Sequence, residues 1–252
     1  MASPAVPPVT GSTPAAPLRV EIWSDIACPW CYVGKARFEK GLAAFAHRDG
    51  VEVVHRSFEL DPDRAKGDVA PVLDLLARKY GRTREEAQAM EETVAAHARA
   101  EGLDYRTHGR DHGPTFDIHR VLHLAKARGR QSGLLDLAYR ANFAEEASVF
   151  DDEVLVKLAV AAGLDEAETR GVLADPTAYA DDVRGDEREA AELGANGVPF
   201  FVLDRRYGIS GGQPAEVFTQ ALEQAWQDRA PLKPVTSAAA DGATCDTDGN
   251  CA

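Results

Sequence analysis

The feature that most constrains the fold is a pair of cysteines two residues apart, in Cys28-Pro29-Trp30-Cys31, between a strand pattern and a helix pattern. Residues 18–23 alternate as a strand does, and helical periodicity runs over residues 28–47. Pro29 falls in the first helical turn, where its missing N–H costs nothing. Free backbone N–H groups and the positive end of the dipole at a helix start favour a thiolate over a thiol. The motif therefore predicts a dithiol/disulfide redox centre.

The alternatives for this cysteine pair are a zinc site and an inert buried pair. A structural zinc site needs four ligands, but the only other cysteines are Cys245 and Cys251, and no histidine lies close to the first pair in the sequence. An inert buried pair would not need a strand, a turn and a helix that begins with proline. The context therefore favours redox chemistry.

Composition sets broad limits on size and partners. With 252 residues, 44% of them hydrophobic, the chain can form one large domain or two small ones. A net charge of −13 argues against nucleic acid or an acidic membrane surface as the main partner. No apolar stretch approaches the length of a membrane-spanning helix.

Residues 1–17 lack the basic start and apolar run of an export signal, so we expect a disordered arm and a cytoplasmic protein. In that compartment a CxxC pair is more often catalytic than structural.

The rest of the chain alternates between strand-rich ends and a helical middle. Residues 51–58 form a second strand pattern, beside the first in a βαβ unit with a right-handed crossover. Residues 71–193 look almost wholly helical, with six or seven segments between glycine and proline breakers. Strand patterns return at residues 199–203 and 206–209, followed by a helix over residues 215–228. The order predicts an α/β fold in which both ends share one sheet and the helical block is an insertion.

This order, with a CxxC pair directly after the first strand, resembles the thioredoxin-like fold in its DsbA form. The segment Trp-Ser-Asp-Ile-Ala-Cys-Pro-Trp-Cys-Tyr-Val-Gly at residues 23–34 is similar to the FrnE-like branch of that family, which is related to 2-hydroxychromene-2-carboxylate isomerases. Phe-Glu-Leu-Asp-Pro at 58–62 and Gly-Val-Pro-Phe-Phe at 197–201 also fit that branch. The resemblance covers residues 18–228.

The predicted domains follow from this assignment. Residues 18–64 and 194–229 form the thioredoxin-like domain, and residues 65–193 form a helical insertion domain. Residues 1–17 are a disordered N-terminal arm. Residues 230–252 are a flexible C-terminal tail that carries the second cysteine pair.

The resemblance also implies roles for individual residues. Cys28 is the attacking thiol and Cys31 the buried resolving thiol, and exchange proceeds through a mixed disulfide at Cys28. The bond between Val198 and Pro199 is expected to be cis and to lie opposite the cysteines; a trans proline that begins an edge strand is the alternative. A proline there leaves the preceding backbone free to pair with a substrate peptide. Trp30, with little to bury against at a helix start, is expected to contact substrate.

Three further residues are accessory candidates. Asp25 and Glu59 are carboxylates that could carry protons for Cys31, although solvated turn residues are the alternative. His119 belongs to a segment that, by resemblance, faces the active site. His119 and His123 are four apart and could mark a metal site, but no HExxH glutamate accompanies them, so an ordinary partly buried histidine is favoured and no metal is predicted.

The tail contains the second cysteine pair, Cys245 and Cys251, separated by turn-forming residues. A flexible linker of about sixteen residues would span roughly 20–24 Å, enough to bring this pair towards the first. We hypothesise that the two pairs exchange disulfides. The alternative is an accidental pair in a mobile tail, because spacing alone is weak support.

Together these patterns predict a thiol-disulfide oxidoreductase that acts on disulfide- or thiol-containing proteins or small molecules. No cofactor is expected, with glutathione or another thiol as a co-substrate. The alternative is a glutathione-dependent isomerase of the 2-hydroxychromene-2-carboxylate type; by resemblance those enzymes lack paired cysteines and use a hydroxyl at the first position. A third interpretation is a zinc-binding or partner-docking protein. The sequence indicates neither the physiological substrate, nor the direction of electron flow, nor the oligomeric state.

Overall fold

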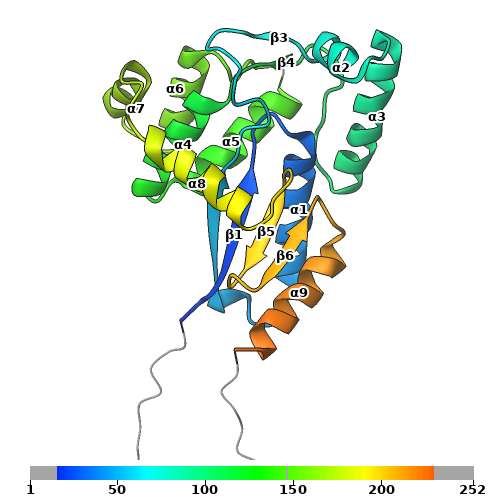
Figure 1. The fold of residues 1–252 in the computed structure, drawn as a ribbon, viewed down its shortest axis with the longest axis vertical. Helices are drawn as coiled ribbons and strands as arrows, with labels where there is room; N and C mark the ends of the chain where they lie inside the picture. The colour runs from blue at the N-terminus through cyan, green and yellow to red at the C-terminus, as the bar shows by residue number, and fades with distance from the viewer. Residues whose placement is uncertain (1–15, 146, 230–252) are drawn as a thin grey trace, which may run out of the picture.

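A computed structural model describes residues 16–145 and 147–229, which form an α/β fold with a helical block at one end of the sheet (Figure 1). The strands are β1 (Leu18–Ser24), β2 (Val51–Ser57), β3 (Ala70–Pro71), β4 (Asp111–His112), β5 (Phe200–Leu203) and β6 (Tyr207–Ser210). The helices are α1 (Pro29–Ala44), α2 (Val72–Tyr80), α3 (Arg84–Ala100), α4 (Phe116–Ala127), α5 (Gln131–Ala144), α6 (Asp152–Ala161), α7 (Glu166–Ala174), α8 (Ala180–Glu192) and α9 (Ala215–Gln227), with a 3₁₀ turn at Arg48–Gly50.

The main sheet joins the two ends of the chain, as the sequence predicts. Its order is β2-β1-β5-β6; β1 is parallel to β2 and antiparallel to β5. The hairpin between β5 and β6 turns through Asp204 and Arg205, which both have positive φ, at 46° and 57°. A turn with two positive φ values matches the twist of the strands it joins. The α/β class and the single shared sheet are therefore confirmed.

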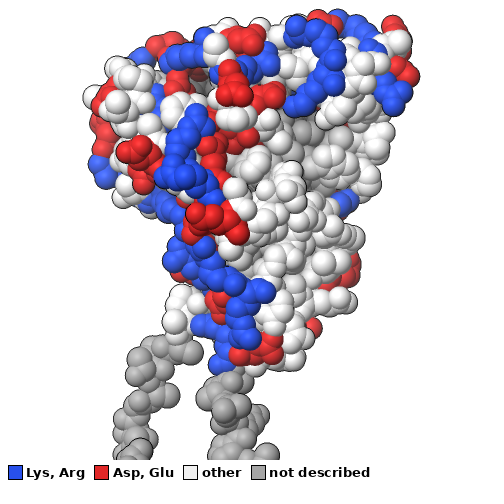
Figure 2. All heavy atoms as spheres, in the orientation of Figure 1, with Lys and Arg blue, Asp and Glu red and all other residues white. Residues whose placement is uncertain are grey.

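Both faces of this sheet are covered by helices. On one face Ile22 and Phe201 pack with Phe38 of α1 and Phe218 of α9 in one apolar cluster. On the other face Trp23, Phe200 and Val202 pack against Ala190 of α8. In the view of Figure 2, charged side chains run down one side, over α8 and the β5–β6 turn, whereas the surface over β6 and α9 is mostly uncharged. Because helices pack against both faces of the sheet, β1 is buried on both sides.

The block between β2 and β5 contains α2 to α8 and is helical as expected. A capping box begins α3: the Glu86 N–H donates to the Thr83 hydroxyl and the Thr83 N–H to the Glu86 carboxylate. One feature differs from the prediction, because β3 and β4 form a short antiparallel pair inside the block. Two-residue strands are too short to produce a period-two pattern. Among the described residues, no helix is long and apolar enough to cross a membrane.

The contact between α1 and α9 depends on Gly41. A Cβ atom at this position would lie 2.6 Å from the Ala215 carbonyl oxygen and 2.8 Å from Phe218 Cβ. Gly41→Ala should therefore destabilise the protein by about 2 kcal/mol through overpacking, despite the better helix propensity of alanine. The melting temperature should fall by roughly 4–8 °C.

Gly171→Ala on α7 is the matched control, because a Cβ there meets nothing within 4 Å. That change should leave stability unchanged or raise it by up to about 1 kcal/mol. Equal melting temperatures for the two variants would show that α9 can move away from α1 at no cost.

Candidate active site

The paired cysteines lie where β1 ends and α1 begins. Cys28 is the N-cap residue of α1, and Pro29 occupies the first helical position. Both cysteines are free thiols, with 5% of Cys28 and 1% of Cys31 exposed. Cys28 thus sits beside the unpaired N–H groups of the helix start, whereas Cys31 is buried one turn behind it. Cys28 is therefore the outer thiol of the pair and Cys31 the inner one.

The loop before β5 closes over the outer thiol. The Val198–Pro199 peptide bond is cis, as the resemblance implies. The Cys28 thiol donates to the Val198 carbonyl oxygen, with 3.6 Å between sulfur and oxygen. Gly34 makes the close approach possible, since a Cβ there would lie 2.9 Å from Pro199 Cγ. The helix, the loop and the thiol are therefore held together by direct contact.

The inner thiol is held in its protonated form. Burial raises the pKa of Cys31 well above its usual value, and interaction with the Cys28 thiol raises it further, while a backbone hydrogen bond from Asp25 opposes the rise. Cys31 must lose a proton before it can attack a disulfide, since the thiolate is the nucleophile. A proton acceptor near Cys31 would therefore govern this step.

Asp25 is the buried carboxylate next to the inner thiol. Its side chain is 1% exposed and accepts hydrogen bonds from the backbone N–H groups of Ala27, at 3.2 Å, and Leu60, at 2.8 Å. His119 Nε2 on α4 lies 3.5 Å from Asp25 Oδ1. Burial would raise the pKa of Asp25, but His119 and the two N–H groups outweigh it and lower that pKa. His119 thus lies against Asp25, and Asp25 is buried rather than a solvated turn residue.

His119 connects this carboxylate to a second acidic group. It is 2% exposed, and neither of its ring nitrogens meets the geometry of a hydrogen bond within residues 16–145 and 147–229, although Nε2 lies 3.5 Å from Asp25 Oδ1. Burial lowers its pKa, but interactions with Asp25 and the charges of Glu59 and Glu187 outweigh burial, so the pKa is raised. Burial also raises the pKa of Glu59 to about 7, although His119 and Arg184 oppose this rise. Asp25, His119 and Glu59 thus form a buried titratable group behind the cysteines.

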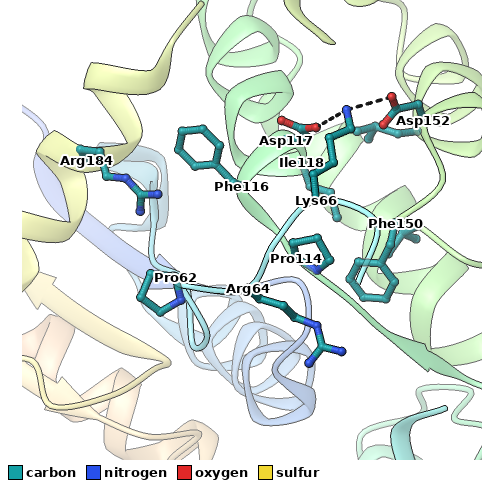
Figure 3. A pocket seen from close by; sticks show the side chains of 13 residues that line it. Pro62, Arg64, Lys66, Pro114, Phe116, Asp117, Ile118, Phe150, Asp152 and Arg184 are labelled. Carbon is teal, nitrogen blue, oxygen red and sulfur yellow. Dashed lines mark hydrogen bonds and ion pairs between the residues drawn. The ribbon is translucent and has the colours of Figure 1, made fainter. Parts of the chain in front are cut away.

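Arg184 links the buried group of Asp25, His119 and Glu59 to the protein surface. Arg184 Nη1 donates to Glu59 Oε2 at 2.6 Å, and its guanidinium lies over the Phe116 ring, 4.5 Å from its centroid. Arg184 and Phe116 line a cavity of about 180 Å³ at the junction of α4, α6 and α8 (Figure 3). The cations around it are paired with acids; Lys66, for example, contacts Asp117 and Asp152.

Trp30 is less free than the sequence suggests. Its ring packs against His97 of α3, with 5.1 Å between the ring centroids, so it has a partner to bury against. It still lines a cavity of about 270 Å³ beside Cys28. The expected substrate contact therefore stays a prediction, but Trp30 does have a side chain to pack against at the helix start.

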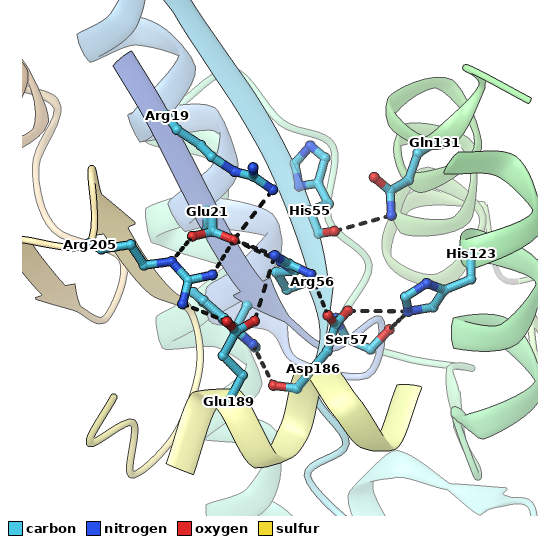
Figure 4. A network of polar contacts seen from close by, with 11 residues as sticks. Arg19, Glu21, His55, Arg56, Ser57, His123, Gln131, Asp186, Glu189 and Arg205 are labelled. Carbon is cyan, nitrogen blue, oxygen red and sulfur yellow. Dashed lines mark hydrogen bonds and ion pairs between the residues drawn. The ribbon is translucent and has the colours of Figure 1, made fainter. Parts of the chain in front are cut away.

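His119 and His123 contact different partners. His123 Nε2 lies 3.2 Å from both Asp186 Oδ2 and Ser57 Oγ, in the polar network between β2, α4 and α8 (Figure 4). Within the described ranges, no three His, Cys, Asp or Glu side chains are grouped so as to hold a metal ion. The spacing of the two histidines reflects two separate buried contacts.

The insertion contributes residues that the sequence did not single out. On α5, Asn142 Nδ2 donates to the Ile26 carbonyl at 2.9 Å, and the Tyr139 hydroxyl lies 3.4 Å from the Asp25 carbonyl. Both hold the turn that presents Cys28, and no local pattern marks them. The predicted second pair, Cys245 and Cys251, lies outside the described residues.

Comparison with known proteins gives the family. A DSBA-like thioredoxin domain model matches residues 19–223. The crystal structure of a protein described as a probable DsbA oxidoreductase from Streptomyces coelicolor is 70% identical, covering 93% of this chain and 98% of that one, with a TM-score of 0.83.

More distant structures share the fold. Cytosolic disulfide reductase DsbM from Pseudomonas aeruginosa has a TM-score of 0.59 at 19% identity, over 83% of this chain and 99% of that one. A 2-hydroxychromene-2-carboxylate isomerase has a TM-score of 0.61 at 12% identity, over 83% of this chain and 97% of that one. The chain therefore belongs to the family of DsbA-like thioredoxin-domain oxidoreductases, as its sequence predicts.

Proposed function

We propose that this protein is a thiol-disulfide oxidoreductase whose redox centre is Cys28 and Cys31. The observation that carries the proposal is the placement of Cys28 at the N-cap of α1, against the Val198 carbonyl, with Cys31 buried behind it. The Cys28 thiolate attacks one sulfur of a substrate disulfide and releases the other as a thiolate. Cys31 then attacks the Cys28 sulfur and releases the second half. The substrate gains two electrons and two protons, and the enzyme gains a Cys28–Cys31 disulfide.

Substrate is proposed to lie against the loop before β5 and the start of α1. Pro199 has no N–H, so the backbone ahead of it at Val198 is available to an extended peptide. Trp30 is partly buried on His97 and offers the rest of its ring on the other side of Cys28. Val198, Pro199 and Trp30 are therefore the proposed substrate-binding residues.

Asp25 is proposed to accept the proton of Cys31 when Cys31 attacks. Its lowered pKa keeps it ionised at neutral pH, as a base must be. His119 stabilises that carboxylate, and Glu59 lies between His119 and Arg184 on the way to the surface. His119 and Glu59 act through Asp25 and are positioning residues.

The tail cysteines are proposed to pass disulfides to or from the first pair. Tail and core would exchange two electrons through a mixed disulfide between Cys28 and one of Cys245 and Cys251. A full-length variant with both tail cysteines replaced by serine should turn over more slowly with a macromolecular reductant. Unchanged turnover with every reductant tested would remove this part of the proposal.

Glutathione or another thiol is the proposed co-substrate, and a cytoplasmic location is proposed. One structure of the Pseudomonas reductase, named as cytosolic, carries GSH, which supports both statements by analogy. The isomerase alternative has support from the fold alone, and Cys28 stands where the resemblance implies a hydroxyl.

Cys31→Ser provides the test of the redox centre. Because Cys31 can no longer release the mixed disulfide, the variant should accumulate a covalent adduct at Cys28, visible by mass spectrometry after acid quenching. Cys28→Ser should form no adduct at Cys31, since that residue is 1% exposed. Equilibration of the native protein in glutathione buffers then sets the direction: a potential near roughly −120 mV indicates an oxidant and one near roughly −270 mV a reductant. Absence of a Cys28–Cys31 disulfide at every potential would overturn the proposal.

A further inference from the structure

The outer thiol carries its proton towards a carbonyl group. The acceptor is the Val198 oxygen, 3.6 Å from the Cys28 sulfur, and a carbonyl oxygen stabilises the thiol rather than the thiolate. Asp25, the base proposed for Cys31, is 1% exposed and lies behind the inner thiol. Because the thiolate is the nucleophile, attack by Cys28 needs a proton acceptor on the side of the pair that faces substrate.

The cavity of about 270 Å³ beside the outer thiol contains one such acceptor. Besides the thiol, its titratable lining side chains are Lys79, Tyr80, Glu91, Arg110 and His112. Lys79 and Arg110 have donors only. Glu91 is held by Arg110 in a salt bridge whose side chains are 4% and 2% exposed. Tyr80 is 53% exposed, and a phenol oxygen is a poor base. His112 is the side chain that remains.

His112 has both an orienting partner and a free acceptor nitrogen. It belongs to β4, where it pairs with Ala70 of β3, and its ring centroid lies 6.2 Å from that of Phe150. Its Nε2 lies 3.4 Å from Asp61 Oδ2, which assigns the ring proton to Nε2 and makes Nδ1 the acceptor. Within residues 16–145 and 147–229, no hydrogen bond occupies Nδ1. A nucleophile, a base and a group that orients the base are the parts of an activated nucleophile.

The surroundings of His112 favour the neutral ring that a base requires. Burial lowers its pKa, the charge of Asp25 raises it, the charge of Arg64 lowers it, and the hydrogen bond and charge of Asp61 raise it. The balance is a pKa below the ordinary value of 6.5. Lys79 Nζ, 3.3 Å from Asp61 Oδ1, neutralises part of the charge of that carboxylate. The imidazole is therefore uncharged at neutral pH.

We propose that His112, oriented by Asp61, is the general base that takes the proton of the Cys28 thiol when Cys28 attacks a substrate disulfide. This inference rests on the proposed function and adds a catalytic group to its first step. The Cys28 S–H bond and the substrate S–S bond break, and a bond forms between Cys28 and one substrate sulfur. The proton moves to His112 Nδ1, directly or through a water molecule, and then to the released thiolate. The Cys28 sulfur is oxidised and the departing sulfur is reduced.

Cys31→Ser isolates this step, because that variant cannot release the adduct at Cys28. The probe is bis(2-hydroxyethyl) disulfide, which is uncharged and symmetrical. The measurement is the second-order rate constant of adduct formation, by acid quenching and mass spectrometry, with and without His112→Gln. A thiol without a base is only a few per cent thiolate at pH 7, so His112→Gln should slow adduct formation at least about tenfold.

The pH profile distinguishes a base from a structural group. With His112 present, the rate should hold as the pH falls until the imidazole is protonated, below pH 6.5 because its pKa is lowered. With His112→Gln the rate should rise with pH and reach that of Cys31→Ser alone above about pH 9, where a thiol ionises without help. A deficit caused by distortion of the site would be the same at every pH.

Two further variants in the Cys31→Ser background identify the group. Asp61→Asn keeps the shape of the side chain and removes its charge, so His112 becomes a weaker base and the rate at pH 7 should fall severalfold. His108→Gln is the control. His108 is exposed, its Nδ1 lies 3.0 Å from the hydroxyl of Thr107, and it does not line the cavity. It should leave the rate unchanged. Melting temperatures check that all variants are folded.

The outcomes separate the two proposals. Equal rates with and without His112 at every pH would overturn the role of His112 and leave the redox function intact. A deficit that does not close at high pH, or one that His108→Gln reproduces, would overturn it as well. Failure of Cys31→Ser to form any adduct at Cys28 would overturn the redox function itself, and this inference with it.

Discussion

Asp25→Asn should slow the release of the mixed disulfide by Cys31 about 100-fold at neutral pH, which is within the usual effect of a general base. The amide keeps the size of the carboxylate and one acceptor for the N–H groups of Ala27 and Leu60. It cannot take the proton that Cys31 must lose. The first step, attack by Cys28, should proceed at nearly the native rate. A rapid acid quench after mixing with a peptide disulfide measures both steps, because the mixed disulfide should accumulate.

The pH profile distinguishes a proton-transfer role from a structural one. His119 lowers the pKa of Asp25 against the effect of burial, so His119→Asn should raise that pKa. Asp25 is a base only when ionised, and the variant should therefore need a higher pH for the release step. The acidic limb of the pH profile should move to higher pH. Glu59 and Glu187, the other acids that interact with His119, are still present in this variant.

His123→Asn is the matched control on the same helix. His123 is also buried, but its partners are Asp186 and Ser57 rather than Asp25. Its loss should reduce stability and leave the pH profile of the release step where it was. Identical profiles for both histidine variants would contradict the role assigned to His119.

The start of α1 was predictable because its signals are local. Alternation in β1, a proline in the first helical turn and two cysteines one turn apart lie within a few residues of each other. The capping box at Thr83 and Glu86 was predictable for the same reason. Each of these patterns specifies a backbone conformation without reference to the rest of the chain.

The electrostatic environment of the site was not predictable, because distant segments create it. In the sequence Asp25 looks like an ordinary turn residue. In the structure α4 places His119 beside its carboxylate, and α5 places the Tyr139 hydroxyl near its carbonyl. The sequence likewise suggests that Trp30 has little to pack against, whereas in the structure His97 of α3 packs against its ring. Nothing in the periodicity of the helical block says which of its helices will face the cysteines.

The same limit applies to β1, because alternation alone does not show what covers the polar face of a strand. Arg19 and Glu21 alternate with apolar residues and lie on one face of β1. Glu21 is 1% exposed, because α8 covers that face. The sequence shows the polar face of the strand but not the helix that later closes over it.

Glu21→Gln should accordingly cost about 3 kcal/mol of stability at pH 7, because it removes the buried carboxylate that Arg56 and Arg205 share and leaves Arg56, with 16% of its side chain exposed, only partly compensated. Arg56 Nε donates to Glu21 Oε1 at 3.0 Å and Arg205 Nη2 at 2.8 Å (Figure 4). Asp186 and Glu189 still neutralise these arginines in part, which places the loss at the lower end of that class. The melting temperature should fall by roughly 6–12 °C. Arg19→Gln is the control and should cost under about 0.5 kcal/mol, since Arg19 is 46% exposed and lies 3.8 Å from Glu21.

The sign of the pH dependence follows from the same contacts. Burial raises the pKa of Glu21, but the hydrogen bonds and charges of Arg56 and Arg205 outweigh it and bring the pKa below its ordinary value of 4.5. A carboxyl with a lowered pKa stabilises the fold above that ordinary value, and the contribution disappears as the pH falls through the pKa of the folded state. The stability difference between the native protein and the Glu21→Gln variant should therefore be complete at pH 7 and shrink steadily below pH 4.5. Denaturant titrations across this range measure it. A difference that does not change with pH would mean that the shape of the Glu21 side chain, rather than its charge, holds β1 to α8 and the β5–β6 turn.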